Sequence, residues 1–376
     1  MTLSKAIKCF TSLQAWQLKR FALLTGCAAG TTKASIADGL AQIINQSQAV
    51  SRNERILSID MGIKNLAFCL LEPYPRMSKS DLSSKSAKKS EAPADQKRFK
   101  IHAWQRLNIL IPPSSTSDPG TLPDLDRSTV SDTDPDKIPA NTFTPSQLAP
   151  LAVRLAQTFL SHNPSTIIIE RQRFRSSRGS AVQEWTLRVN TLEAMLWACF
   201  ETLKSGHQHL HQHQRGHILQ QQDDFPLVKE VSPQRIASFW NARKLGPELE
   251  PGPVVDIYAG IKSEEGSETL VRGMEKKEKI KLVTRWVGEG WIDGVEGMEE
   301  QMDVFAEAKG RRKTKGEGKR DDLADCLVQG VTWALWEENR KILGDLVSED
   351  GGSSGAVHKS VPKISSKKTQ RKDLPP

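Results

Sequence analysis

Residues 56–72, with the sequence ILSIDMGIKNLAFCLLE, decide the fold class of this chain. An apolar segment runs up to Asp60, and apolar residues then alternate from Leu66 to Leu70, a pattern typical of neighbouring β-strands. Gly62 lies between the two segments and permits a tight turn or a bulge. The stretch therefore predicts a β-hairpin whose first strand ends on the carboxylate of Asp60. Taken alone, Asp60 is equally compatible with the simple start of a turn.

A second apolar segment also ends on a carboxylate. The sequence STIIIE, residues 165–170, predicts a short buried strand that finishes on Glu170. A carboxylate after three isoleucines lies at the edge of the core, where the loss of hydration is costly unless a cation is near. The cation could be a metal ion or one of the arginines in the segment RQRFRSSRG that follows.

A third acidic site opens the last predicted helix, residues 321–341. Asp322 and Asp325 are three residues apart, and Asp321 and Asp325 are four apart, so either pair shares one face of the helix. The alternative is that Asp321 and Asp322 only stabilise the positive end of the helix dipole. Carboxylates that converge from two strand ends and a helix form an oxygen-rich site, which suits Mg²⁺ or Mn²⁺.

Apolar periodicity predicts further ordered elements, and polar stretches separate them. Helices are expected within 13–45 (two short ones), at 145–162, 181–203 and 275–287, and after Ser232-Pro233, with a strand in 99–110. The stretches 73–98, 111–144, 205–226 and 243–273 are predicted to be insertions that are disordered or irregular.

Composition and charge exclude several classes of protein. No stretch approaches 18 consecutive apolar residues, which excludes an ordinary membrane-spanning helix. The five cysteines contain no CxxC pair, which excludes a disulfide-rich scaffold and a thiolate zinc site. Alternating histidines between residues 207 and 217 lack matching cysteines, so a zinc site there is the less favoured interpretation. The 53 basic against 45 acidic residues point weakly to a polyanionic partner.

The basic residues are unevenly placed. No acidic residue precedes Asp38, and the basic, hydroxyl-rich start is typical of a mitochondrial presequence, although an ordinary basic helix has the same composition. A second basic run spans residues 309–320, and a third lies in the tail at 346–376, which is predicted to be disordered.

Three motif blocks together resemble the fungal mitochondrial Holliday-junction resolvases of the ribonuclease H-like superfamily. They are ILSIDMGIKNLAFCLLE (56–72), IIIERQRFRS (167–176) and KRDDLADCLVQGVTW (319–333). Spaced Leu, Lys, Gly and Ile residues between 18 and 40 also resemble the SAP motif, a small helical DNA-binding module. The resemblance implies an α/β fold, with a ribonuclease H-like mixed sheet flanked by helices. The chain would then comprise a presequence (1–12), a SAP-like module (13–50), the resolvase domain with its insertions (51–345) and a basic tail (346–376).

The resemblance also implies an activity and a set of site residues. The activity is that of a Mg²⁺-dependent endonuclease that cuts four-way DNA junctions in the mitochondrial matrix, leaves 5′-phosphates and serves DNA recombination and segregation. The catalytic and metal-binding carboxylates would be Asp60, Glu170 and Asp325 with Asp322 or Asp321. Phosphate contacts are expected from Lys64, Asn65, Arg171, Arg173, Arg175, Arg178, Arg311, Arg312, Lys313, Lys319, Arg320 and Lys33.

Paired cuts by a chain with one carboxylate set imply a homodimer. The expected interface is the helix 181–203, which is apolar over more than one face, although burial within its own domain would explain the same pattern. Two other functions stay open. One is a related nuclease acting on RNA–DNA hybrids or on branched DNA in general, and the other is a DNA-binding protein without catalysis.

Overall fold

The computed structural model describes most of the chain outside the predicted insertions. The described residues are 2–28, 30–47, 54–63, 65–75, 97–107, 109, 143–172, 184–214, 225–242, 254–260, 273–295, 297–306 and 317–350. Most of the predicted insertions at 73–98, 111–144 and 243–273, and the tail beyond residue 350, therefore lie outside the described residues.

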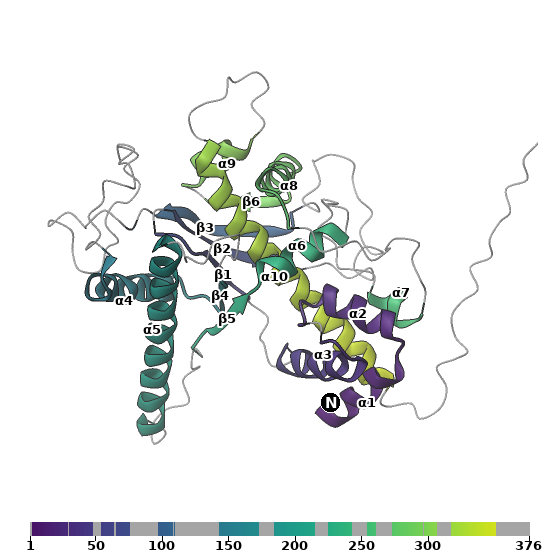
Figure 1. Ribbon diagram of the computed structural model, residues 1–376. Coiled ribbons are helices and arrows are strands. Elements are labelled where there is room, and N and C mark those ends of the chain that lie inside the picture. The colour runs from purple at the N-terminus through teal and green to yellow at the C-terminus, as the bar shows by residue number, and fades with distance from the viewer. Residues whose placement is uncertain are drawn as a thin grey trace, which may run out of the picture.

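The described core is built on a six-stranded mixed sheet with the order β5-β4-β1-β2-β3-β6 (Figure 1). The strands β1, β2 and β3 form an antiparallel meander, β4 joins β1 in parallel, β5 joins β4 in parallel, and β6 joins β3 in parallel. This arrangement confirms the predicted mixed sheet. The strands are β1 (Ile56–Asp60), β2 (Leu66–Pro73), β3 (Phe99–Leu107), β4 (Thr166–Glu170), β5 (Leu227–Val231) and β6 (Ile292–Gly294).

Helices cover both faces of this sheet, and a further group of helices lies beyond one end of it (Figure 1). The helices are α1 (Leu3–Ser12), α2 (Ala15–Leu24), α3 (Lys33–Ser47), α4 (Pro145–Ser161), α5 (Glu184–Gln214), α6 (Pro233–Ala242), α7 (Val254–Tyr258), α8 (Lys276–Gly288), α9 (Glu299–Phe305) and α10 (Glu317–Asp350). None of the helices in the described part of the chain is both long and apolar enough to cross a membrane.

The long helix α10 lies on one face of β1, β2 and β3, where side chains hold it at a defined height. Ser58 Oγ donates to the carbonyl oxygen of Cys326 at 2.7 Å, and Trp104 Nε1 donates to that of Leu323 at 3.0 Å. A Cβ atom on Gly330 would lie 2.2 Å from Leu71 Cδ2, so only glycine allows this close approach. The helix is therefore fixed against the sheet one turn or less from Asp322 and Asp325.

The opposite face of the sheet carries α4 and α5. Phe68 on β2 contacts Phe159 on α4 in an edge-to-face pair with ring centroids 5.4 Å apart, and α5 packs along α4. Phe68 and its neighbour Cys69 point to opposite faces because side chains alternate along a strand. The sheet is thus covered on both sides, which explains why β4 carries three isoleucines in succession and why Ser58 is the only polar residue of β1 before Asp60.

The N-terminal helices α1, α2 and α3 share the hydrophobic core of the rest of the chain. They pack on the C-terminal half of α10, where Asn339 Nδ2 donates to Leu24 O at 2.7 Å and Arg340 Nε donates to Thr25 O at 2.8 Å. Phe10 of α1 is completely buried, so the residues expected as a presequence also build the core. The presequence and the SAP-like role of this unit stay predictions.

Three segments differ from the sequence expectations. Residues 243–273 were expected to be irregular, which is wrong for α7, because Val254 and Ile257 are buried against neighbouring helices. The helix α5 continues to Gln214 and includes the start of the predicted insertion 205–226. The helix α10 continues to Asp350, past the predicted domain end at 345. Helix ends are the least certain part of a prediction from sequence, because the last turns fray and carry little apolar periodicity.

Candidate active site

Two carboxylates meet where β1 and β4 end side by side. In this parallel pair Ile59 is opposite Ile169, so the next residues, Asp60 and Glu170, are neighbours on the same edge of the sheet. Both side chains are partly buried. Burial and the negative charge of Glu170 raise the pKa of Asp60 well above its ordinary value. The proximity that the sequence predicted for these two residues is therefore present in the fold.

The helix α10 adds its carboxylates to the same edge. The charges of Asp325 and Asp322 contribute to the raised pKa of Asp60, which places both near the strand pair. Burial raises the pKa of Asp322 to about 6 and also raises that of Asp325. Gln329, one turn after Asp325, donates to the carbonyl oxygen of Ile59 on β1 at 3.2 Å, which fixes this part of the helix over the strand ends. Carboxylates from three elements thus repel one another in a partly dehydrated site.

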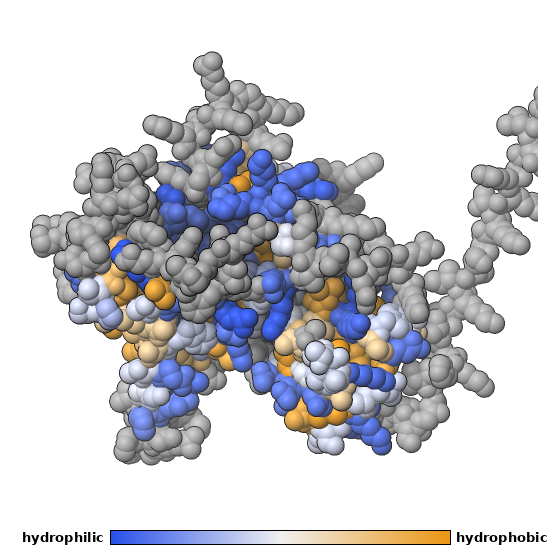
Figure 2. Space-filling model, in the orientation of Figure 1, coloured by the Kyte–Doolittle hydropathy of each residue, from blue (hydrophilic) through white to orange (hydrophobic). Residues whose placement is uncertain are grey.

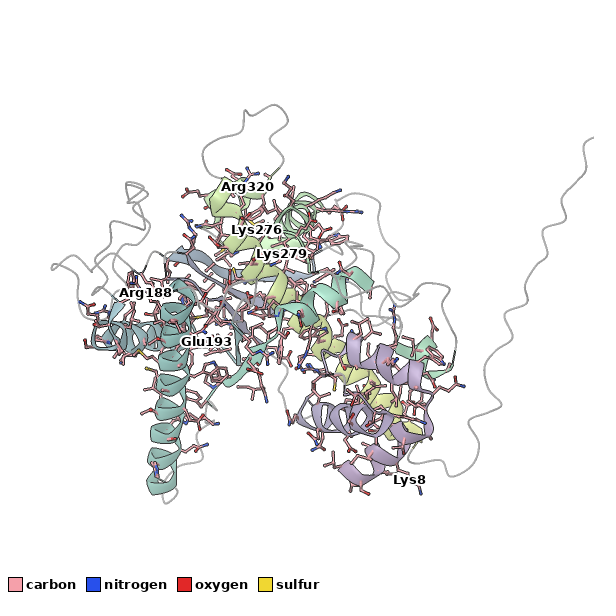
Figure 3. All side chains as sticks on the ribbon, in the orientation of Figure 1. Lys8, Arg188, Glu193, Lys276, Lys279 and Arg320 are labelled. Carbon is pink, nitrogen blue, oxygen red and sulfur yellow. The ribbon has the colours of Figure 1, made fainter. Side chains whose placement is uncertain are left out.

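Three cations partly balance this negative charge. Lys279 Nζ lies 2.9 Å from Asp325 Oδ2, Lys276 Nζ lies 2.9 Å from Asp321 Oδ2, and an Arg106 guanidinium nitrogen lies 3.8 Å from Asp322 Oδ2. Figure 3 shows both lysines reaching from α8 toward α10. Only 20% of the Lys279 side chain is exposed, against 72% for Lys276. Lys279 is therefore an internal counterion of the carboxylates, whereas Lys276 is a surface partner.

The sequence analysis missed Lys279, although its position carries a signal. Lys279 precedes Leu282, Val283 and Trp286, all buried, at the spacing of one face of α8. A lysine on the core-facing stripe of a helix needs an internal negative partner, because burial of an unpaired charge is costly. Burial alone would lower the pKa of Lys279, but the charges of Asp325, Glu170 and Asp60 raise it above its ordinary value.

The carboxylates fit a hard divalent cation by their chemistry. Asp322 Oδ2 and Asp325 Oδ1 are buried and accept no hydrogen bond, so each is an acceptor oxygen that a cation could satisfy. Oxygen donors of this kind are those that Mg²⁺ and Mn²⁺ prefer. Among the residues that the structure describes, no group of three or more His, Cys, Asp or Glu side chains is arranged so that it could hold a metal ion. Lys279 is the counterion of Asp325 in this arrangement, and a bound divalent cation would take over that role.

A fifth carboxylate, Glu193 on α5, lies beside the strand ends and was also missed. Burial raises its pKa, and the charges of Glu230 and Glu170 raise it further. The main chain of Gln172 and the side chain of Trp197 favour its charged form and oppose this rise. Glu193 therefore adds negative charge next to Glu170.

The predicted phosphate-binding residues lie in different parts of the structure, and several lie outside the described residues. Asn65 accepts a hydrogen bond from Arg106 at 3.1 Å, Arg171 lies 3.5 Å from Glu230, and Arg320 precedes the helix carboxylates. Lys33 begins α3 in the N-terminal unit, which packs on the other half of α10, and is not brought to the carboxylates. Of Lys319 only the main chain is described. The residues outside the described part are Lys64, Arg173, Arg175, Arg178, Arg311, Arg312 and Lys313.

Comparisons with known proteins agree with this geometry. Residues 56–343 match the family model described as "Mitochondrial resolvase Ydc2 / RNA splicing MRS1". The chain is 26% identical over 288 residues to the mitochondrial cruciform cutting endonuclease 1 of Schizosaccharomyces pombe, covering 76% of this chain and 80% of that protein.

A solved structure shares the fold. The crystal structure of the yeast mitochondrial Holliday junction resolvase Ydc2 matches with a TM-score of 0.50 and 22% identity, over 90% of this chain and 100% of that one. The match supports the ribonuclease H-like arrangement of the mixed sheet. Because the family model spans the sheet, the strand carboxylates and most of α10, the chain belongs to the mitochondrial resolvase Ydc2 / RNA splicing MRS1 family.

Proposed function

We propose that this protein is a metal-dependent endodeoxyribonuclease that resolves four-way DNA junctions in the mitochondrial matrix. The observation that carries the proposal is the convergence of Asp60, Glu170, Asp322 and Asp325 from β1, β4 and α10. The names of the relatives support the substrate and the organelle. The product would carry a 5′-phosphate.

The acidic and basic residues of the site would have different roles. Asp60, Glu170 and Asp325, with Asp322 or Asp321, would hold Mg²⁺. When bound, the metal would activate water for attack on the phosphorus atom and stabilise the leaving 3′-oxygen. Arg106 and Arg320 flank the carboxylates and would bind neighbouring phosphates without reading base sequence. Partial burial of the carboxylates lowers the effective dielectric constant around them and strengthens these interactions.

A cleavage assay with four substrates tests the proposal. We expect the protein to cut a synthetic four-way junction with symmetric nicks in the presence of Mg²⁺ or Mn²⁺, and to lose activity with EDTA. Linear duplex, an RNA–DNA hybrid and a simple fork should be cut far more slowly. Preferential cutting of the hybrid or the fork would instead favour the broader ribonuclease H-like activity.

A binding protein without catalysis is the second candidate. The family description includes RNA splicing as well as junction resolution. The complete carboxylate set favours the enzyme, because a protein that only binds nucleic acid gains nothing from four mutually repelling acids facing a polyanion. Junction binding without any metal-dependent cleavage would support the binding protein.

Replacing Lys279 by Met should strengthen divalent metal binding. The substitution removes the cation that pairs with Asp325, so the carboxylates attract a metal ion more strongly. We expect the Kd for Mn²⁺ to fall about tenfold, a modest share of what one charge contributes at such distances. Calorimetry or electron paramagnetic resonance on the protein without DNA measures this change independently of activity.

Lys276→Met is the matched control for this experiment. Lys276 forms an ion pair of the same length from the same helix, but its side chain is mostly exposed. Water and salt therefore screen its charge, and the Mn²⁺ affinity should change less than about twofold. Equal effects of the two variants would show that Lys279 is not an internal counterion.

We also propose that the protein acts as a homodimer through the exposed side of α5. Leu187 on α5 is 49% exposed and Val153 on the neighbouring α4 is 43% exposed, while Leu192 and Leu196 of α5 are buried within the chain. Figure 2 shows apolar residues at the surface over α4 and α5. A helix that packs inward on one side and is apolar on another is suited to contact a second copy.

Leu187→Asp should weaken this dimer. We expect light scattering to show a monomer at concentrations where the wild type is dimeric, because a charge placed in an apolar interface must lose its hydration. Val255→Asp is the control, since Val255 is 56% exposed on α7, away from α5. A wild type that is monomeric and still makes both cuts in one binding event would contradict the dimer proposal.

A further inference from the structure

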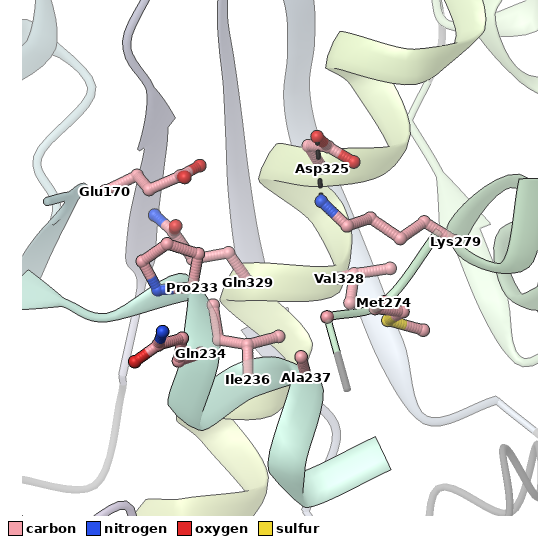
Figure 4. A pocket seen from close by; sticks show the side chains of 11 residues that line it. Glu170, Pro233, Gln234, Ile236, Ala237, Met274, Lys279, Asp325, Val328 and Gln329 are labelled. Atoms are coloured by element: carbon pink, nitrogen blue, oxygen red, sulfur yellow. Dashed lines mark ion pairs between the residues drawn. The ribbon is translucent and has the colours of Figure 1, made fainter. Parts of the chain in front are cut away.

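The helix α8 has two chemically different sides. Its inner side carries buried apolar residues and Lys279, which forms an ion pair with Asp325 at 2.9 Å. Figure 4 looks into the pocket that Lys279 lines together with Glu170 and Asp325, and it shows this ion pair. The first turn of α8 is therefore fixed beside the candidate active site.

The outer side of α8 carries a row of positive charges, which we call the α8 basic stripe. Its members are Lys277, Lys281 and Arg285, which are exposed and follow one another at steps of four residues. Residues four apart share one face of a helix, so the three side chains form a line about 12 Å long. Figure 2 shows hydrophilic residues at the surface where α8 lies in Figure 1.

The described part of the chain does not neutralise the α8 basic stripe. Arg285 forms a surface ion pair with Glu289 at 2.7 Å, whereas Lys277 and Lys281 form no ion pair with any residue that the structure describes. Like charges four residues apart destabilise a helix by about 0.2–0.5 kcal/mol per pair. The α8 basic stripe therefore costs helix stability, which favours a binding role over a structural one.

The α8 basic stripe starts beside the candidate active site and leads away from it. Lys276, the neighbour of Lys277, lies 2.9 Å from Asp321, and Arg285 follows about two and a half turns further along α8. In a DNA strand, one phosphate follows another about every 3.4 Å of duplex length. A line of about 12 Å is therefore long enough to reach about three or four successive phosphates.

The chemistry of this surface fits the backbone of a DNA duplex. Lysine and arginine bind phosphates without reading base sequence. Single strands are bound with the help of aromatic side chains on which bases stack, and membrane surfaces with the help of apolar side chains. The aromatic residue of α8, Trp286, is buried, and none of the apolar residues of this helix is exposed.

We propose that the α8 basic stripe binds the phosphates of one duplex arm of the junction, next to the bond that is cut. The inference rests on the proposed nuclease function and gives α8 a role separate from that of the carboxylates. The inner side of α8 supplies their counterion, and the outer side holds the arm. One packed helix would thus position the arm relative to the site of cleavage.

The salt dependence of junction binding tests the α8 basic stripe. The variant Lys277→Ala/Lys281→Ala removes two phosphate contacts, so the slope of log Kd against log salt concentration, measured in EDTA, should decrease by about 2. We expect the junction affinity at about 0.1 M salt to decrease about tenfold or more. The variant Lys277→Arg/Lys281→Arg keeps both charges and should keep the slope of the wild type.

Lys5→Ala/Lys8→Ala is the matched control. Both lysines are exposed on α1, and Figure 3 shows Lys8 at the other end of the molecule from Lys276 and Lys279. The control removes the same charge from the protein but none of the proposed phosphate contacts. Its slope should therefore differ from that of the wild type by less than about 0.5.

Neutral phosphates locate the contact on the DNA. In one set of junctions, methylphosphonates replace the phosphates nearest the cut bond on one side of it, and in a second set on the other side. We expect one set to bind the wild type about tenfold more weakly but to bind Lys277→Ala/Lys281→Ala about as well as the unmodified junction does. Such non-additivity is the sign of a direct contact.

The outcomes separate this inference from the proposed function. An unchanged slope in Lys277→Ala/Lys281→Ala would overturn the inference, and so would an equal decrease in the control, because the effect would then follow total charge. Additive effects of the variant and of both methylphosphonate sets would overturn it as well. All these measurements are made in EDTA, so cleavage is scored separately. A wild type that cuts no junction with metal would overturn the proposed nuclease, whereas normal cleavage with an unchanged slope would overturn only the α8 basic stripe.

Discussion

Replacing Asp60 by Asn should abolish junction cleavage while junction binding is kept. Asp60 lies where the charges of Glu170, Asp325 and Asp322 converge, so its carboxylate contributes directly to holding a metal ion. Loss of one coordinating charge removes stabilisation that is largest in the transition state, and we expect the single-turnover rate to fall by at least about 10³-fold. Glu170→Gln should behave in the same way. Binding, measured by gel shift in EDTA, should be equal or tighter because repulsion of the phosphates decreases.

Asp345→Asn provides the control for this experiment. Asp345 is an exposed carboxylate on the same helix α10, in the half that carries the N-terminal unit. Its substitution removes the same charge from the protein and should leave the cleavage rate within about twofold, because exposed charges beyond a Debye length are screened. Wild-type activity in Asp60→Asn would remove Asp60 from the site, and loss of binding would show that the substitution disturbs more than the chemistry.

Replacing Gly26 by Ala should destabilise the protein strongly. Gly26 has φ +64°, and a Cβ atom there would lie 2.3 Å from the ring of Trp336 on α10. The left-handed conformation costs about 1–2 kcal/mol for an L-residue, and overpacking adds about 1–3 kcal/mol. The sum, about 2–5 kcal/mol, is a large part of the stability of an ordinary domain, which is about 5–15 kcal/mol. Urea denaturation with a tryptophan fluorescence signal measures the loss.

Gly260→Ala separates the two contributions. Gly260 has a similar φ of +79°, but a Cβ atom there would meet no described atom within 4 Å. Its substitution should therefore cost only the backbone strain of about 1–2 kcal/mol. Equal losses in the two variants would mean that Trp336 does not pack on Gly26, and that the N-terminal unit contacts α10 more loosely than the structure shows.

Local patterns in the sequence were sufficient to predict the main strands and helices. The strands β1, β2, β3 and β4 and the helices α4, α8 and α10 agree with the predicted segments to within a few residues, apart from the long ends of α10. These elements have strong apolar periodicity, which is a local property. The strands β5 and β6 and the helix α9 were not predicted, because they are short and are stabilised by pairing or packing with distant segments.

The residues of the candidate site also differ in whether the local sequence identifies them. Asp60, Glu170 and Asp325 could be chosen from the sequence because each follows or interrupts an apolar run, where an ionised group is unusual. Lys279 could not be separated from the lysines around it until α8 was seen packed on α10. Nothing in the sequence around Gln329 or Glu193 distinguishes them from other polar residues, and their importance comes only from the groups near them in the fold.

What the sequence determined by itself was the type of each main element and the identity of the acids at their ends. It did so because hydrophobic periodicity and the cost of burying a charge act within a few residues. What only the tertiary structure decided was the height of α10 over the strands, set by Gly330 and the bonds of Ser58 and Gln329. That height determines which carboxylates meet, which lysine becomes their counterion, and that a pocket remains beside them. The contacts that set this height join residues more than 200 positions apart, and no local pattern encodes such contacts.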